Sequence, residues 1–387
     1  MTESLSNSLI YLRNFDGVED PRIERHKLYP LNEILFLLVS AVISGCQSWE
    51  EIADFGEDQL PWLRGYLPYL NGTPSHDTLS RVMSLINYRA FEQFFINWVN
   101  STQVVWSGMQ IAIDGKKLRS SADKSEQQKP AAAGGKSAVH LVEAWCGAVK
   151  LCLGQYKTED KSNEITAIPA LLDLLDIKNC AISIDAMGCQ KKIAEKIIGH
   201  EANYIFGLKA NQETLFEAVK ERFLSEKEQV GEVFEEPVEE KIKRGRIDQR
   251  RCRVLKSQTL PETLTTEWKG IRSIIEIQSE RLVLANEAYS FEKRYYISSL
   301  EVGPQQFNEM IRAHWGIENN LHWTMDVTFS EDEARKRKGF AAQNFGLIRR
   351  IALNLLQKIP DKISTARKMA KCARSDNYKN KVLNFNA

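Results

Sequence analysis

Two aspartates stand at the ends of short apolar segments typical of buried β-strands. Asp114 follows Ile111-Ala-Ile, and Asp185 follows Ala181-Ile-Ser-Ile. Side chains beyond the carboxyl ends of neighbouring parallel strands gather at one edge of an open sheet. Carboxylates held close together repel each other, and a bound cation relieves the repulsion. A single strand-end aspartate more often caps a helix, so the pair, rather than either residue alone, predicts a site for Mg²⁺, which prefers oxygen ligands.

A third carboxylate lies far downstream, in the segment Arg312-Ala-His-Trp-Gly-Ile-Glu-Asn-Asn-Leu-His-Trp323. If this segment is helical, the spacing of four places His314, Glu318 and His322 on one face. That face can hold Glu318 over the strand ends as a third metal ligand. The spacing differs from the HExxH zinc pattern. The alternative is an amphipathic helix that packs its histidines and tryptophans at an interface, and the two aspartates favour the metal site.

The elements expected around these residues form an α/β fold. Strands are expected at residues 111–114, 139–146, 148–156, 181–185 and 204–208, and helices from 162 or 163 to 175, at 190–198 and at 212–224. This order resembles a ribonuclease-H-like mixed sheet flanked by helices. Strands near 250–255, 273–279 and 294–299 indicate a β-rich insertion at about 228–300, after which helices resume at 303.

The flanking regions differ in texture. Residues 1–100 are expected to form a helical N-terminal domain, with helices at 31–43, at 48–55 behind a Ser48–Glu51 capping box, and at 76–86. The catalytic domain is expected at 109–360 and a basic tail at 361–387. The polar stretch 120–136 is low in complexity and expected to be mobile.

Charge is segregated along the chain, although the formal net charge is only +1. Residues 1–100 hold 7 basic and 13 acidic side chains, whereas residues 335–387 hold 14 basic and 2 acidic ones. A second basic run, residues 241–253, contains Arg244 and Arg246. Such segments can neutralise DNA phosphates locally. The alternative for each run is a solvated surface.

Composition also bears on the compartment. The 387 residues include seven cysteines without a CxxC pair, which is typical of reduced thiols rather than a disulfide framework. The longest apolar run, residues 34–46, is too short to cross a bilayer. No charged-then-apolar leader opens the sequence. We expect a cytoplasmic protein without a membrane partner.

The chain resembles the H-repeat-associated transposases of bacterial insertion sequences, a branch of the DDE superfamily. The motifs that carry the resemblance run in order through nearly the whole chain. They include Gly72-Thr-Pro-Ser-His-Asp-Thr78, Ile113-Asp-Gly-Lys116, Lys161-Ser-Asn-Glu-Ile165, Ile184-Asp-Ala-Met-Gly-Cys-Gln190, Leu208-Lys-Ala-Asn-Gln212 and His314-Trp-Gly-Ile-Glu-Asn319.

The resemblance implies a ribonuclease-H-like fold, two Mg²⁺ ions for which Mn²⁺ can substitute, and cut-and-paste chemistry on double-stranded DNA, with a homodimer on paired ends. By position, Asp114, Asp185 and Glu318 match the catalytic, metal-binding carboxylates. Lys209 matches a basic position that contacts DNA phosphate. Arg312 has either a similar role or that of a surface helix residue.

Three functions remain open at the level of sequence: an active transposase, a catalytically silent DNA-binding remnant of a mobile element, and a Mg²⁺-dependent DNA nuclease on the same fold. The intact carboxylates favour the first and third. Asp326 and Glu164 are weaker candidates for an acidic ligand, and a role in the first turn of a helix suits Glu164 better.

Overall fold

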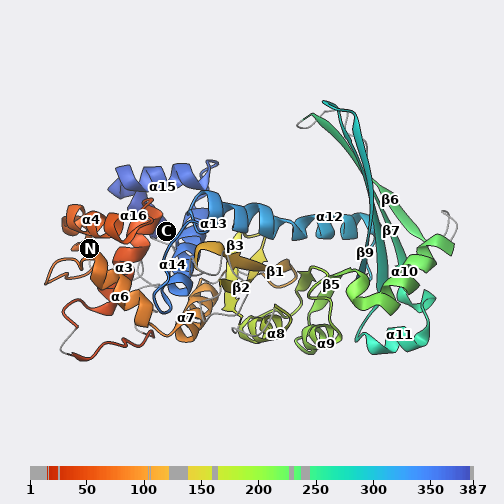
Figure 1. Ribbon diagram of the computed structural model, residues 1–387, viewed down its shortest axis with the longest axis horizontal. Coiled ribbons are helices and arrows are strands. Elements are labelled where there is room, and N and C mark those ends of the chain that lie inside the picture. The colour runs from red at the N-terminus through yellow and green to blue at the C-terminus, as the bar shows by residue number, and fades with distance from the viewer. Residues whose placement is uncertain are drawn as a thin grey trace, which may run out of the picture.

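The computed structural model describes residues 15, 17–24, 27–102, 104, 106–121, 138–158, 164–225, 231–236 and 245–383. The molecule is elongated, with a helical region at one end, a sheet across the middle and a β arm at the other end (Figure 1). Arg244 and most of the stretch 120–136 lie outside the described residues. No helix in the described ranges has the length and apolar character needed to span a membrane.

The N-terminal region is helical, as expected. Its helices are α3 (Leu31–Ile43), α4 (Trp49–Asp58), α5 (Leu60–Leu63), α6 (His76–Leu85) and α7 (Tyr88–Ser101). The expected capping box is present, since Glu51 N–H donates to Ser48 Oγ and the Glu51 carboxylate accepts from Ser48 N–H. Nearly every residue of α3 is buried, which agrees with a helix that is apolar on all sides.

The central sheet has the expected ribonuclease-H-like arrangement. Its strands here are β1 (Gln110–Leu118), β2 (Val139–Cys146), β3 (Leu151–Lys157), β4 (Ala181–Ile184) and β5 (Asn203–Leu208). They lie in the order β3-β2-β1-β4-β5, with β1, β2 and β3 antiparallel and β1, β4 and β5 parallel. Helices α8 (Glu164–Leu174) and α9 (Lys191–Gly199) lie on one side in Figure 1, and α12 (Pro304–His314) lies on the other.

The β-rich insertion continues this same sheet. After α10 (Glu213–Ser225), strands β6 (Glu232–Glu235), β7 (Arg246–Lys256), β8 (Ser273–Val283) and β9 (Ala288–Ser298) follow, with α11 (Glu262–Glu267) between β7 and β8. Strand β9 pairs antiparallel with β5, so the sheet has nine strands. The outer strands are longer than expected and project as the arm in Figure 1.

Helix α14 (Ala341–Lys358) lies between the sheet and the helices of the N- and C-terminal regions. It packs against α3, α6, α7 and β3, and almost all of its side chains are buried. The segment expected as a basic tail instead forms α15 (Thr365–Arg374) and α16 (Asp376–Leu383), which pack on α14 and α3. The reason is its buried apolar side chains, which include Met369, Cys372 and Leu383.

Candidate active site

The two aspartates occupy equivalent places on neighbouring strands. The parallel pairing of β1 with β4 ends at Ile113 opposite Ile184, so Asp114 and Asp185 are the next residues on each strand. Strand β1 was expected to end at Asp114. It continues to Leu118 instead, because it remains paired with β2. The parallel edge of the sheet nevertheless ends at these aspartates, which is the feature that brings them together.

Asp185 is fixed by the turn that follows β4. Its Oδ1 accepts hydrogen bonds from the backbone N–H groups of Met187, at 3.0 Å, and Gly188, at 3.2 Å. The residue therefore acts as a turn residue as well as standing at the strand end. Its Oδ2 makes no hydrogen bond within the described part of the chain, and the side chain is exposed. One oxygen orients the carboxylate and the other remains available to a ligand.

Glu318 approaches the strand ends from a helix that changes its winding. Helix α12 is followed by a π-helical turn, η5 (Ile317–His322), in place of the regular α-helix expected. Single π-helical turns of this kind occur often at functional sites. Ile317 and Leu321 are fully buried and hold the turn in the protein core. Glu318 itself is exposed.

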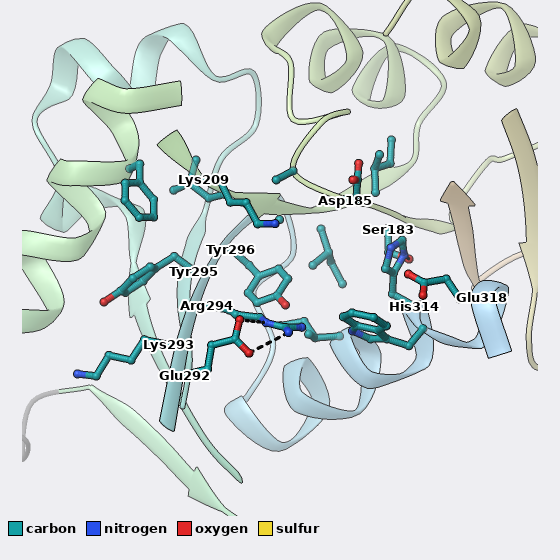
Figure 2. Close-up of a pocket in the computed structure, with 18 residues that line it drawn as sticks. Ser183, Asp185, Lys209, Glu292, Lys293, Arg294, Tyr295, Tyr296, His314 and Glu318 are labelled. Atoms are coloured by element: carbon teal, nitrogen blue, oxygen red, sulfur yellow. Dashed lines mark hydrogen bonds and ion pairs between the residues drawn. The ribbon is translucent and has the colours of Figure 1, made fainter. Parts of the chain in front are cut away.

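The flanking histidines contact the sheet on either side of Glu318. His314 Nδ1 lies 3.0 Å from Ser183 Oγ on β4. His322 Nδ1 lies 3.7 Å from Asp114 Oδ2. The prediction that 314, 318 and 322 share one face of a regular α-helix stays a prediction, because residues 317–322 form a π-helical turn. Figure 2 shows Ser183, Asp185, His314 and Glu318 together at one side of a cavity of about 370 Å³.

The charges of the three carboxylates act on one another. The pKa of Asp114 is raised to about 7, mainly by burial, with a smaller contribution from the charges of Asp185 and Glu318 and with His322 acting in the opposite direction. Within the described ranges, however, no three His, Cys, Asp or Glu side chains stand close enough to hold a metal ion by themselves. Any ion here needs water or substrate oxygens to complete its shell, which is usual for Mg²⁺.

A fourth carboxylate reaches the same edge. Glu164 is the first residue of α8, and its carboxylate lies directly against Gly115, the residue after Asp114. Burial raises the pKa of Glu164, and the charge of Asp185 raises it further. We call Asp114, Asp185, Glu318 and Glu164 the acidic edge.

Behind Asp114 lies a group of charges that the sequence reasoning missed. Glu143 faces Asp114 across β1 and β2. Its carboxylate lies 3.1 Å from His322 Nε2 and accepts a 2.6 Å hydrogen bond from Arg350 Nε of α14. Arg350 also donates to Glu331, at 2.9 Å through its second nitrogen. Glu143, Arg350 and Glu331 are essentially inaccessible to solvent.

Lys116 extends this group. Its Nζ lies 2.7 Å from Asp326 Oδ1 and 3.0 Å from Glu331 Oε2. Asp326, considered above as an acidic ligand, is thus paired with a lysine. We call Glu143, Arg350, Glu331, Lys116 and Asp326 the buried ion network.

The sequence does carry a signal for the buried ion network, because ionisable residues interrupt runs that are otherwise apolar. Glu143 stands inside Leu141-Val-Glu-Ala-Trp145, and Arg350 stands inside Leu347-Ile-Arg-Arg-Ile-Ala-Leu353. Charges at buried positions are normally paired. The sequence does not say with which partner.

The basic residues expected to contact DNA are dispersed. Lys209 is exposed and lines the cavity beside Asp185 (Figure 2). Arg312 points to the arm, where it forms a 2.7 Å ion pair with Glu236. Arg246 lies near the free end of the arm and pairs with Asp248 at 3.0 Å. Of these described residues, Lys209 alone lines the cavity at the acidic edge.

Comparison with known families agrees with this architecture. Residues 106–355 match the family described as "Transposase DDE domain", and residues 12–99 match the family described as "DDE_Tnp_1-associated".

Individual relatives cover most of the chain. It is 41% identical to "Putative transposase YncI" of Escherichia coli O157:H7, over 98% of this chain and 95% of the relative. It is 42% identical to "H repeat-associated putative transposase YhhI" of Escherichia coli strain K12, over 92% of each. A cryo-EM structure of a piggyBac transposase synaptic complex with hairpin DNA aligns with a TM-score of 0.45 at 10% identity, covering 97% of this chain and 81% of that one. A likeness of that degree supports no conclusion.

Proposed function

This chain belongs to the DDE transposase family, and we propose that it cleaves DNA and joins strands at the ends of an insertion sequence. The observation that supports the proposal is that Asp114 and Asp185 follow the paired ends of neighbouring parallel strands, while Glu318 lines the same cavity as Asp185. Each comes from a different element, and the charges of Asp185 and Glu318 act on Asp114. Uncompensated carboxylates at close range are disfavoured unless a cation joins them.

We propose Mg²⁺ as that cation, with Mn²⁺ as a substitute. The donors fit, because they are hard carboxylate oxygens without a thiolate, and Asp185 keeps one oxygen free of protein hydrogen bonds. Asp114, Asp185 and Glu318 would hold the ions. A pair of such ions activates an attacking oxygen and stabilises a leaving oxygen during phosphodiester cleavage.

The protein's own residues orient this chemistry. The turn at Met187 and Gly188 fixes the Asp185 carboxylate, and His322 stands between Asp114 and Glu143. Lys209 lies in the same cavity, where it would meet a DNA phosphate near the scissile bond. Contacts of that kind are independent of sequence and weaken with salt. Because two element ends must be brought together, we also propose that a homodimer forms on paired ends.

The test is Mg²⁺-dependent cleavage and joining of duplex DNA that carries the element ends. Asp114→Asn should lower the cleavage rate on the order of 10³-fold or more, because ion-assisted stabilisation of the transition state contributes several kcal/mol. Asp173→Asn is the matched control, since Asp173 lies near the other end of α8 and pairs with Lys196. The control should cleave like wild type.

The possible outcomes separate the three functions. Equal cleavage by wild type and Asp114→Asn would remove Asp114 from the active site. Cleavage without strand joining would identify a nuclease. DNA binding without cleavage would identify a silent remnant of a mobile element.

A further inference from the structure

We propose that the loop of residues 334–339 binds the phosphates of DNA held at the acidic edge, through Arg335 and Lys338. We call residues 334–339 the basic loop. The inference rests on the proposed function, because it concerns the same DNA. The juxtaposition that carries it is an exposed basic segment fastened to the end of β1, the strand that carries Asp114.

The basic loop is joined to the turn that follows β1. Arg337 Nε donates a 3.1 Å hydrogen bond to the backbone oxygen of Ser120. Just before the loop, Asp332 Oδ2 lies 3.4 Å from Arg119 Nε. Both contacts join the segment that precedes α14 to the residues directly after β1. The basic loop therefore lies where β1 leaves the acidic edge.

The length of β1 sets the spacing between this loop and the acidic edge. Leu118, the last residue of β1, lies four positions after Asp114, which is roughly 13 Å along the strand. Consecutive phosphates of one DNA strand are about 3.4 Å apart along the helix axis. The basic loop is therefore expected to contact DNA about four or five phosphates from the one at the acidic edge.

Contacts at both ends of the basic loop hold it in place. Lys336 is buried, and its Nζ donates a 2.6 Å hydrogen bond to the backbone oxygen of Gln47. Gly339 has a φ of +49°, in the left-handed region that favours glycine. The next residue, Phe340, donates its N–H to Ser84 O at 3.1 Å. A loop that is already ordered loses less conformational entropy when it binds a partner.

The outward side chains of the basic loop carry positive charge that the chain does not fully neutralise. Arg335 and Lys338 are exposed, and in the described part of the chain neither forms an ion pair. In the preceding turn, Asp332 pairs with Arg119, and Glu333 is the exposed acid that offsets the loop. Such a local excess of cations attracts phosphates and releases counterions on binding.

The arginines that were expected to contact DNA are placed differently. Arg312 pairs with Glu236 at 2.7 Å, and Arg246 pairs with Asp248 at 3.0 Å. An arginine that keeps its carboxylate partner adds no net charge for a phosphate to neutralise. The basic loop is therefore better suited than either arginine to hold the DNA backbone.

The experiment measures the binding of duplex DNA with the element ends to the full chain. Fluorescence anisotropy in EDTA makes the measurement independent of cleavage. The double variant Arg335→Gln with Lys338→Gln removes two charges from the basic loop. Its Kd at low salt should rise on the order of tenfold, and the slope of log Kd against log salt concentration should fall by about 2.

Arg367→Gln with Arg374→Gln is the matched control. Both arginines are exposed on α15, within the same basic stretch of sequence, residues 335–387. The control changes the net charge of the protein by the same amount, so it should bind DNA like wild type if the basic loop makes the contacts. Both double variants should unfold thermally like wild type, since exposed side chains are replaced.

A neutral methylphosphonate in the DNA tests the position of the contact. Placed about four or five phosphates from the cleavage site, it should weaken binding by wild type. The same DNA should bind the double variant of the basic loop about as well as unmodified DNA does, because the interacting charge is already absent.

A double variant of the basic loop that binds DNA as tightly as wild type would overturn the inference. Equal weakening in the α15 control, or a wild type that binds no DNA, would overturn it too. If the wild type cleaves the element ends and the double variant binds them normally, the inference alone fails. If the wild type binds DNA through the basic loop and does not cleave it, the inference stands and the proposed function fails.

Discussion

Two sets of carboxylates lie side by side in this protein, and their surroundings shift their pKa values in opposite directions. In the buried ion network, Glu143 is wholly buried, and burial alone would raise its pKa, yet Arg350 and His322 lower the pKa to about 2. In the acidic edge, burial and the neighbouring carboxylates raise the pKa of Asp114 to about 7. The two residues are nevertheless direct cross-strand partners, Asp114 on β1 and Glu143 on β2.

The difference shows where the protein supplies its own cations and where it does not. Arg350 and Lys116 compensate Glu143, Glu331 and Asp326 from within the chain. At the acidic edge, the ion-pair partner of Asp114 in the described part of the chain is His322, 3.7 Å away, which Glu143 also contacts. A structural carboxylate is paired permanently, whereas a carboxylate that must bind a cation has to remain unpaired until the cation arrives.

The largest expected effect comes from breaking the buried ion network. Glu143→Gln leaves Arg350 with one carboxylate partner in a buried site, so it should destabilise the fold by about 3–5 kcal/mol at neutral pH. The folded pKa of Glu143, about 2, lies below the unfolded value of roughly 4.3. Its contribution is therefore present above the unfolded pKa and is lost as pH falls toward about 2.

Urea unfolding of wild type and Glu143→Gln at several pH values measures this contribution. The gap between the two proteins should close as the pH is lowered. A gap that is constant across the acid range would mean that Glu143 stabilises the fold by packing and not by its charge.

Removing a charge from the acidic edge should stabilise the fold, whereas removing one from the buried ion network should destabilise it. The folded pKa of Asp114, about 7, lies above its unfolded value of roughly 3.9. Its favourable contribution is thus full below the unfolded pKa and is lost as pH rises through about 7. In EDTA at pH 8, Asp114→Asn should therefore be more stable than wild type, by about 1–3 kcal/mol.

The same unfolding experiment at pH 4 should show the two proteins nearly equal. If Asp114→Asn is less stable than wild type at pH 8, the Asp114 charge is compensated in the folded protein. The proposed contrast between an uncompensated Asp114 and a compensated Glu143 would then be wrong.

The smallest effect is the response to metal. Mn²⁺ at ten times its Kd should stabilise the wild type by about 1.4 kcal/mol, because binding to the folded state alone shifts the unfolding equilibrium. Asp114→Asn should gain much less, whereas Glu143→Gln, once corrected for its lower stability, should still respond. Thermal melting with Mn²⁺ and with EDTA measures both. Equal gains in wild type and Asp114→Asn would place the ion elsewhere.

Much of the fold could be predicted because it is encoded locally. Helix α3 and strand β2 have the expected bounds, residues 31–43 and 139–146, since apolar periodicity, Pro30 and the flanking turns define them within a few residues. The Ser48–Glu51 capping box is equally local. The extension of β1 past Asp114 could not be predicted in this way, because it depends on pairing with β2 across a long loop.

For the candidate site, the sequence by itself determined the carboxylates that end the parallel strands and the histidine–glutamate spacing of residues 314–322. Only the tertiary structure decided which charges are neutralised. Arg350 and Glu143 are 207 residues apart, and Glu164 and Gly115 meet through helix packing. A side chain's type is written in the sequence, but its electrostatic environment is set by what the fold brings next to it.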